Sequence, residues 1–320
     1  MGPQSAPRNQ HYIPQCYLRG FALDEARPRL FVVDLQDRRT FSANPRNIGS
    51  ERDFNTFLID GKPRYDLESV MGTLEGEFGP ALRELDRTAR FDGECRILIL
   101  NLIAALALRN PRMRATMEAF MTELFEMVLE LNLQTRERWE GLVKRMRADG
   151  IEVKDVDYEV MRDFQQRGEY DFIFPAGFHH RQEFKLLDKV LPYFFERKWT
   201  VLRAAPGSEG FITSDQPVCL TWTNPSERAG LPLPGFGTMN TDIFFPVSRK
   251  TALLGRFEGQ EQVLRADVFD VSACNGTVIQ LSRRQVYAAT DAFLYRARPL
   301  SALREGRKLL RDMTGHRAAS

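Results

Sequence analysis

The feature that most constrains this fold is the order of its strand-like and helix-like sequence patterns. Strand-like segments lie at both ends of the chain, and helical segments fill the middle. Apolar and β-branched residues at 30–35, a turn at 37–39 and a second extended piece at 40–43 together predict a β-hairpin. From Trp199 onward the alternation is again that of strands. Because a two-stranded ribbon is marginally stable alone, we expect the hairpin to pair with these later strands.

The later strands are predicted to be short and separated by glycine- and proline-containing turns. They are predicted at residues 199–203, 210–215, 218–222, 242–247, 251–255, 277–281 and 285–289. Helices are predicted at residues 67–85, 95–108, 113–146 (one helix or a pair), 157–167 and 178–195. This order predicts the α+β class: a mostly antiparallel sheet formed by the N-terminal hairpin and the C-terminal strands, with a large helical insertion between them.

We expect one α+β domain over residues 11–297, with its helical region at about 66–196. A flexible lead at 1–10 precedes it, and a C-terminal helix and tail at 298–320 follow. The lead has no apolar signal core, and the longest apolar run, 97–108, is shorter than the ~20 residues that span a bilayer. These features favour a cytoplasmic protein that does not enter membranes.

Composition narrows the classes of partner. The chain has 45 Lys and Arg against 43 Asp and Glu, so its formal charge is +2. This balance disfavours nonspecific nucleic-acid binding over a basic surface, although a local basic groove stays open. The four cysteines are scattered without a Cys-x-x-Cys pair, and the P-loop, the dinucleotide-binding glycine motif, the His-Glu-x-x-His zinc motif and the EF-hand loop are absent. No cofactor is indicated, and a divalent metal stays open.

Histidine is scarce, and His11 lies where the polar lead gives way to aromatic and apolar residues, three positions before Pro14. As a functional residue it would be a general base, a metal ligand or a phosphate contact. The alternative is a histidine that bonds backbone or faces solvent. The adjacent pair His179 and His180 opens a predicted helix, where neighbouring side chains point about 100° apart. We interpret that pair as surface or capping residues.

Two carboxylates and one arginine are the other candidates. Glu51 lies in a polar, glycine-containing loop, and Asp215 follows a predicted strand just before Pro217 turns the chain. Each also has a structural interpretation. Glu51 would be a solvated acid in a loop, and Asp215 would be a turn residue that bonds its neighbouring backbone. Arg109 ends an apolar run just before Asn110 and a proline, so its guanidinium needs an anionic partner, in a site or in a structural ion pair.

The segments His-Tyr-Ile-Pro-Gln-Cys-Tyr-Leu-Arg-Gly-Phe (11–21) and Phe-Ile-Thr-Ser-Asp-Gln-Pro-Val (211–218) resemble the end motifs of an uncharacterised bacterial domain family of unknown function. Weaker landmarks match at Glu51 to Phe54, Arg109 to Arg112, Phe245 to Ser248, and Cys274-Asn275. The chain has Phe-Pro-Val-Ser where the family pattern would have Pro-Leu-Ser. The resemblance implies one unit over residues 10–295 and no particular activity.

We expect a hydrolase acting on a phosphate-containing substrate, with a nucleotide or nucleic acid as candidates. The assigned residues are His11, Glu51 and Asp215 as catalytic groups, and Arg109, Thr213, Ser214 and Asn275 as substrate contacts. The alternative is a non-catalytic binding or regulatory module, in which His11–Asp215 and Arg109–Glu51 pairs form a structural polar network.

Two further expectations concern geometry. The hairpin should bring the N-terminal segment to the later strands, so that the His11 and Asp215 side chains meet within ~3–6 Å, directly or through one water. The long helices between residues 67 and 146 combine an apolar face with mixed charge, which predicts a homo-oligomer formed through them.

Overall fold

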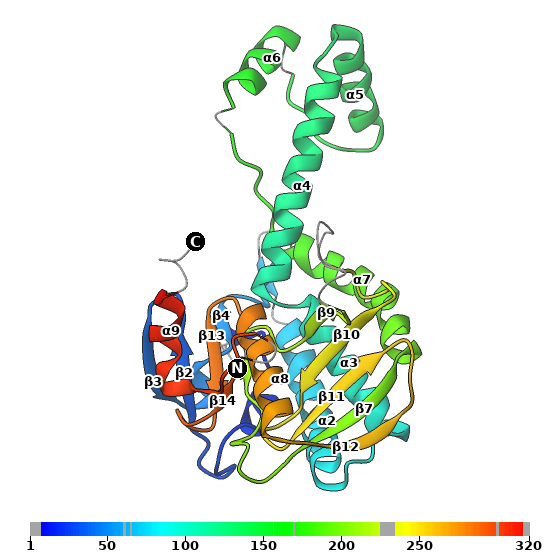
Figure 1. The fold of residues 1–320 in the computed structure, drawn as a ribbon. Helices are drawn as coiled ribbons and strands as arrows, with labels where there is room; N and C mark the ends of the chain where they lie inside the picture. Colours follow the sequence, from blue (N-terminus) through cyan, green and yellow to red (C-terminus); the bar gives the residue numbers. More distant parts are fainter. Residues whose placement is uncertain are drawn as a thin grey trace, which may run out of the picture. The chain divides into compact units, whose positions relative to one another are not determined.

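The computed structural model describes residues 8–59, 62–64, 66–155, 157–168, 170–224, 234–298 and 301–315 (Figure 1). The chain divides into two compact units: one comprises Met1–Asn110 with Ala176–Ser320, and the other comprises Pro111–Pro175. The α+β class is confirmed, because helices form a block between two groups of mainly antiparallel strands. The domain division predicted at residues 1–10, 11–297 and 298–320 stays a prediction.

The N-terminal hairpin pairs with C-terminal strands, as predicted. Its sheet is antiparallel, in the order β3-β2-β13-β8. The strands are β2 (Leu30–Asp34), β3 (Arg39–Ala43), β13 (Gln285–Ala288) and β8 (Thr213–Ser214). The segment that contains His11 does not join this sheet: β1 (Asn9–His11) pairs with β4 (Ser50–Arg52), and α1 (Gln15–Arg19) follows.

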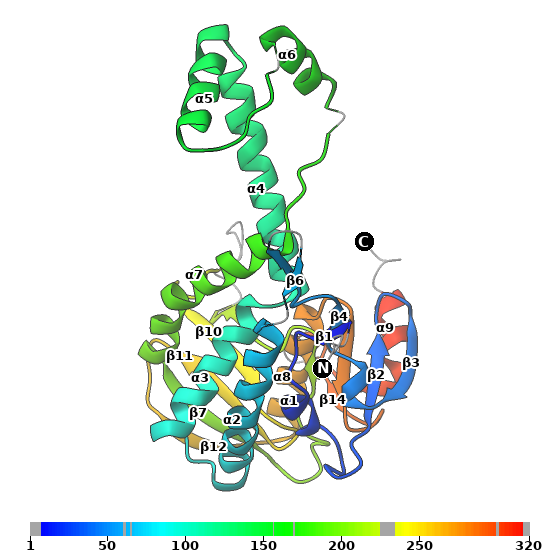
Figure 2. The same cartoon turned by 180° about the vertical axis from the view of Figure 1, so that it is seen from behind.

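Five other C-terminal strands form a separate sheet in the order β12-β7-β11-β10-β9. They are β12 (Gln262–Ala266), β7 (Lys198–Ala204), β11 (Thr251–Arg256), β10 (Thr241–Pro246) and β9 (Cys219–Trp222). Only the β12–β7 pair within this sheet is parallel. One face of the sheet is covered by three helices, seen in front of it in Figure 2: α2 (Asp66–Thr88), α3 (Gly93–Leu108) and α7 (Ala176–Glu196).

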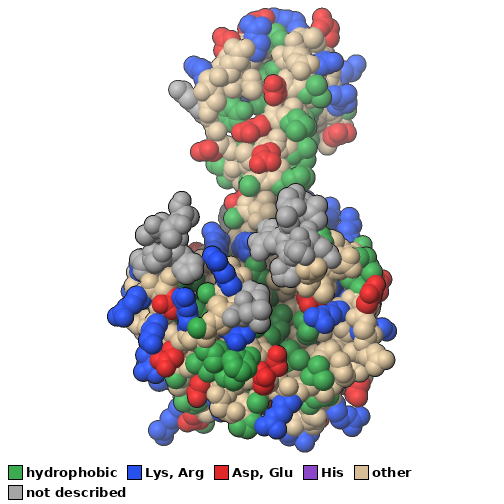
Figure 3. Space-filling view, in the orientation of Figure 1, with side chains coloured by type: hydrophobic (Ala, Val, Ile, Leu, Met, Phe, Trp, Pro, Cys, Tyr) green, Lys and Arg blue, Asp and Glu red, His purple; other side chains and the backbone are tan. Residues whose placement is uncertain are grey.

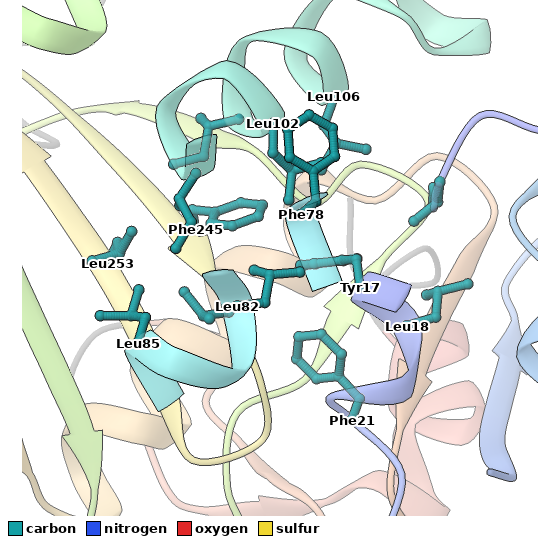
Figure 4. Packing of buried hydrophobic residues seen from close by; sticks show 14 of the residues in the cluster. Tyr17, Leu18, Phe21, Phe78, Leu82, Leu85, Leu102, Leu106, Phe245 and Leu253 are labelled. Carbon is teal, nitrogen blue, oxygen red and sulfur yellow. The ribbon is translucent and has the colours of Figure 1, made fainter. Parts of the chain in front are cut away.

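The main hydrophobic core lies where α1, α2 and α3 meet this sheet. Figure 4 shows Tyr17 of α1, and Phe21 just after this helix, beside Leu82 of α2 and Phe245 of β10. The rings of Tyr17 and Phe245 stack with centroids 5.2 Å apart. The run predicted to be a buried helix is α3, in which every residue from Ile99 to Leu108 is buried except Asn101 and Ala105. Core packing therefore fixes the N-terminal motif against the later strands.

One predicted strand is wrong. Residues 277–281 lie in α8 (Val268–Leu281), whose side chains pack in a second core between the two sheets. Asp267 starts this helix, and Asp267 and Asp270 form a reciprocal capping box. The β-branched residues misled the prediction because a helix buried on several sides loses its amphipathic period.

Other departures are smaller. The parallel edge strand β12 was not predicted, since its side chains are mostly exposed. Within the predicted C-terminal helix and tail at 298–320, the described residues form β15 (Arg304–Glu305), which pairs with β14 (Leu294–Tyr295), and a short α9 (Leu309–Gly315). Residues 299–300 lie outside the described part. No helix among the described residues is long and apolar enough to cross a membrane.

The second unit contains α4 (Pro111–Asn132), α5 (Arg136–Ala148) and α6 (Tyr158–Arg167). The long predicted helix is thus a pair, and the Thr135 side chain caps the second member. A small core of Leu133, Trp139 and Tyr158 holds the unit together, and the Tyr158 hydroxyl donates to the Leu133 carbonyl at 2.9 Å.

Candidate functional site

Tyr17 joins the N-terminal motif to the late motif. Its buried hydroxyl donates to the Pro246 carbonyl at 2.8 Å and lies 2.7 Å from the Thr213 hydroxyl. Burial raises the pKa of Tyr17 well above its ordinary value, so the phenol stays protonated. Thr213 is fully buried, and the Ser214 hydroxyl accepts the Gln216 N–H at 3.0 Å. The predicted substrate contacts Thr213 and Ser214 therefore bond Tyr17 and the local turn.

Asp215 is bound to backbone. Its two carboxylate oxygens accept the N–H groups of Arg283 (3.0 Å) and Arg284 (2.7 Å), which closes the turn before β13. Burial raises the pKa of Asp215, and the N–H donors only partly offset this. The predicted contact between the His11 and Asp215 side chains stays a prediction. Tyr12, next to His11, is within electrostatic range of both acids: burial raises its pKa first, and the charges of Asp215 and Glu51 raise it further.

The Asn275 side chain also forms its hydrogen bonds with backbone groups. Its amide oxygen accepts the Ile212 N–H at 3.0 Å, and its nitrogen donates to the carbonyls of Gly210 (3.0 Å) and Leu294 (2.8 Å). The side chain is fully buried. We call Tyr17, Thr213, Ser214, Asp215 and Asn275 the strand-end group. Every one of its members bonds backbone or another member. Glu51 is exposed on β4, opposite Gln10.

Arg109 belongs to a different cluster. It caps the end of α3, where its N–H still bonds the Ala105 carbonyl at 2.8 Å. Its Nη2 donates to the Asn55 amide oxygen at 2.7 Å, and its Nε lies 3.6 Å from Glu183 Oε2. The exposed fractions are 8 % for Arg109, 1 % for Asn55 and 5 % for Glu183. The buried guanidinium therefore has an anionic neighbour. That neighbour is Glu183, whereas the structural alternative above names Glu51.

His180 extends this cluster. Its Nδ1 lies 3.3 Å from Glu183 Oε2, one helical turn further along α7. The interpretation of His179 and His180 as surface residues is wrong, because their exposed fractions are 6 % and 5 %. The reason is tertiary: α7 packs on α3, which brings Glu183 of α7 to the end of α3 where Arg109 is. We call Asn55, Arg109, His180 and Glu183 the Arg109 cluster.

The N-terminal segment reaches the Arg109 cluster through Gln10 and the backbone of His11. Gln10 is fully buried, and its amide oxygen accepts the Asn55 N–H at 2.5 Å. The Asn55 amide nitrogen donates to the His11 carbonyl at 3.4 Å. Gln216, next to Asp215, donates to the Asn110 amide oxygen at 3.1 Å. The strand-end group and the Arg109 cluster are therefore adjacent, linked by the Gln216–Asn110 bond.

The cluster combines a cation, a carboxylate and an imidazole away from water. A carboxylate beside a histidine orients the ring and stabilises its protonated form, and a guanidinium orients anions. Among the described residues, no group of three or more His, Cys, Asp or Glu side chains is arranged to hold a metal. The four cysteines, all within the described residues, form no disulfide, and burial raises the pKa values of Cys16 and Cys274 to about 12, which disfavours a thiolate nucleophile.

Sequence reasoning selected Arg109 and missed Asn55, His180 and Glu183. The spacing of His180 and Glu183, three residues apart on a predicted helix, was a usable signal. Asn55 follows an aromatic residue in a polar loop and carries no such signal.

No curated protein and no solved structure matches the chain. One family model matches residues 9–292. That range contains the strand-end group and the Arg109 cluster in full. The chain belongs to the family described as "Protein of unknown function (DUF4238)".

Proposed function

We propose that the protein is a hydrolase of a phosphate-containing substrate, a nucleotide or nucleic acid among them, and that the Arg109 cluster is its acid–base centre. The observation that carries the proposal is the buried chain of ionisable groups from Arg109 through Glu183 to His180. A buried ion pair contributes little net stability compared with apolar packing, so its presence favours a use in chemistry.

The roles follow from the contacts. His180 is the group that exchanges a proton with the substrate or water, and Glu183 orients its ring and balances its charge. Arg109 orients an anionic group, while Asn55 fixes the guanidinium plane. His11 and Asp215 keep proposed catalytic roles only as residues near this centre. The assay tests whether a divalent metal is required.

The test is a screen of the full chain against p-nitrophenyl phosphate, bis(p-nitrophenyl) phosphate, nucleotides and single-stranded RNA and DNA, with Mg²⁺, with Mn²⁺ and with chelator. His180→Gln keeps a side chain that can bond Glu183, and it should lower kcat by about 10²–10⁴-fold. The control Asp242→Asn removes a carboxylate that pairs with Arg256 in the five-stranded sheet, and it should keep the wild-type kcat. Equal activity of His180→Gln and wild type would refute the assignment.

The competing function is a non-catalytic binding or regulatory module in which the same residues only hold the fold. One observation favours it: Asn55 ties Gln10 and His11 of β1 to Arg109 at the end of α3, two segments far apart in the sequence. Under this function no substrate of the screen turns over, and the effect expected of His180→Gln is a lower melting temperature.

We also propose self-association through α4. Its apolar residues are spaced four, three, four, three and four apart, the repeat of a coiled-coil seam, at Met113, Met117, Phe120, Leu124, Met127 and Leu131. Phe120 is 58 % and Met127 65 % exposed, and Figure 3 shows hydrophobic side chains between acidic ones on this unit. The spacing is the same in both directions, so a second copy can lie antiparallel with apolar positions opposed.

Charge supports the antiparallel arrangement. The first turn of α4 carries Arg112 and Arg114, and its second half carries Glu123, Glu126 and Glu130. Sedimentation should show a dimer for wild type, a monomer for Phe120→Glu/Met127→Glu, and a dimer for the control Ile173→Glu, whose side chain is 90 % exposed off this stripe. A wild-type monomer at tens of micromolar would remove the proposal.

A further inference from the structure

We propose that a pocket between α8 and the C-terminal segment binds a small organic anion with an apolar body. The pocket has a volume of about 620 Å³, within the usual range for small-molecule sites. None of its lining residues belongs to the Arg109 cluster or the strand-end group, so the inference goes beyond the proposed hydrolase function.

The lining combines an apolar wall with arginines. Ile279 of α8 and Leu309 of α9 contribute apolar surface, and Arg283, Arg296 and Arg304 contribute positive charge. The class of ligand follows from this pairing, because apolar walls bind hydrocarbon and guanidinium groups bind carboxylate, sulfate or phosphate.

The three arginines are not equivalent. Arg304 forms an ion pair with Asp312 at 3.3 Å, and Asp312 also accepts the Tyr295 hydroxyl at 2.6 Å. This acid neutralises one cation. Arg283 lies within electrostatic range of Asp215, whose oxygens bond backbone. Arg296 forms no ion pair with any described residue, and its guanidinium lies over the Phe269 ring, 4.6 Å from the centroid. Arg296 is thus the principal cation left for a ligand.

The backbone holds Arg296 firmly at this wall. Its N–H donates to the Ser272 carbonyl at 2.9 Å, and the Gln280 amide donates to the Ala297 carbonyl at 2.8 Å. Gly276 allows the close approach, since a Cβ there would collide with the Arg296 carbonyl oxygen. A binding group that is already fixed loses little entropy when a ligand arrives.

The Nε of Arg296 is buried and has no hydrogen-bond partner in the described structure. A buried donor without an acceptor is unfavourable, and a carboxylate bound at this wall would offer an acceptor. The anionic head of such a ligand would lie near Arg296, and its apolar tail would pack along Ile279 and Leu309.

The experiment is calorimetric titration of the full chain with octanoate, octanol, acetate and inorganic phosphate. Octanoate should bind saturably, and the other three should bind at least tenfold more weakly because each lacks the head or the tail. Arg296→Gln should weaken octanoate binding at least tenfold. The control Arg307→Gln, in the same C-terminal segment, should bind like wild type, because Arg307 is paired with Glu305 outside the pocket.

A second variant, Ile279→Glu, places a like charge in the wall and should also abolish octanoate binding while its melting temperature confirms folding. Absence of saturable octanoate binding, equal binding of octanol, equal binding of phosphate, or an unaffected Arg296→Gln would each overturn the proposal. Neither variant should change hydrolysis in the screen above, so failure here is separable from failure of the proposed function.

Discussion

The strand-end group and the Arg109 cluster are two buried polar groups that differ in what their side chains bond. In the strand-end group, Asp215 and Asn275 bind backbone N–H and carbonyl groups. In the Arg109 cluster, Arg109 and Glu183 bind side chains, and most of these are ionisable.

The difference has a physical consequence. Backbone groups cannot be removed by substitution, so losing a side chain that satisfies them leaves buried polar groups without partners. Charged side chains that satisfy one another can be removed together, which also removes the free energy of their desolvation. The strand-end group should therefore be required for stability, and the Arg109 cluster should be replaceable for stability and required for function.

The largest expected effect is that of Asn275→Leu. The substitution leaves the Ile212 N–H and two carbonyls buried without hydrogen-bond partners. It should lower the free energy of unfolding by about 3 kcal/mol or more. Urea denaturation checks it. The control Asn101→Leu removes an amide that bonds only the Ile97 carbonyl of its own helix, and it should change stability by less than about 1 kcal/mol. Equal effects of the two variants would erase the contrast between buried and local bonds.

An intermediate effect is expected for Tyr17→Phe. The variant keeps the stacked ring and removes the hydroxyl that joins Pro246 and Thr213, so the loss should be about 1–2 kcal/mol. Thermal melts compare it with Tyr193→Phe, whose ring is 39 % exposed and whose hydroxyl should contribute little. A Tyr17→Phe protein as stable as wild type would mean that packing alone joins the two motifs.

The smallest effect is a dependence on pH, with opposite signs for two aspartates. For Asp34, burial raises the pKa, but hydrogen bonds from the Asp37 N–H, Gln285 and Arg284 outweigh it and lower the pKa. The stability due to Asp34 is present above its unfolded pKa, ~3.9, and is lost as pH falls through the lower folded value. For Asp215 the folded pKa is raised, so its contribution decreases as pH rises through that value.

Urea unfolding between pH 3 and 7 separates the two signs. Asp34→Asn should flatten the acid loss of stability, and Asp215→Asn should steepen it, each relative to wild type. The same change in both variants would contradict the opposite directions of their pKa shifts.

The sequence predicted the α+β class, the hairpin and its pairing with later strands, because those features follow from local periodicity and turn residues. It also placed Arg109 at a buried helix end from the apolar run and the following proline. It missed Glu183 and His180 because their burial depends on α7 packing against α3, which no local pattern encodes. It misassigned residues 277–281 because a helix buried between two sheets has the composition of a strand.

The central claim is that the Arg109 cluster serves function and not stability. The most direct test is the double variant Arg109→Met/Glu183→Met, which replaces both charges by apolar side chains of similar length. We predict a loss of less than about 2 kcal/mol in the free energy of urea unfolding, well below that of Asn275→Leu, because the desolvation of both ions is relieved. A loss as large as that of Asn275→Leu would show that the cluster holds the fold, and would contradict the account.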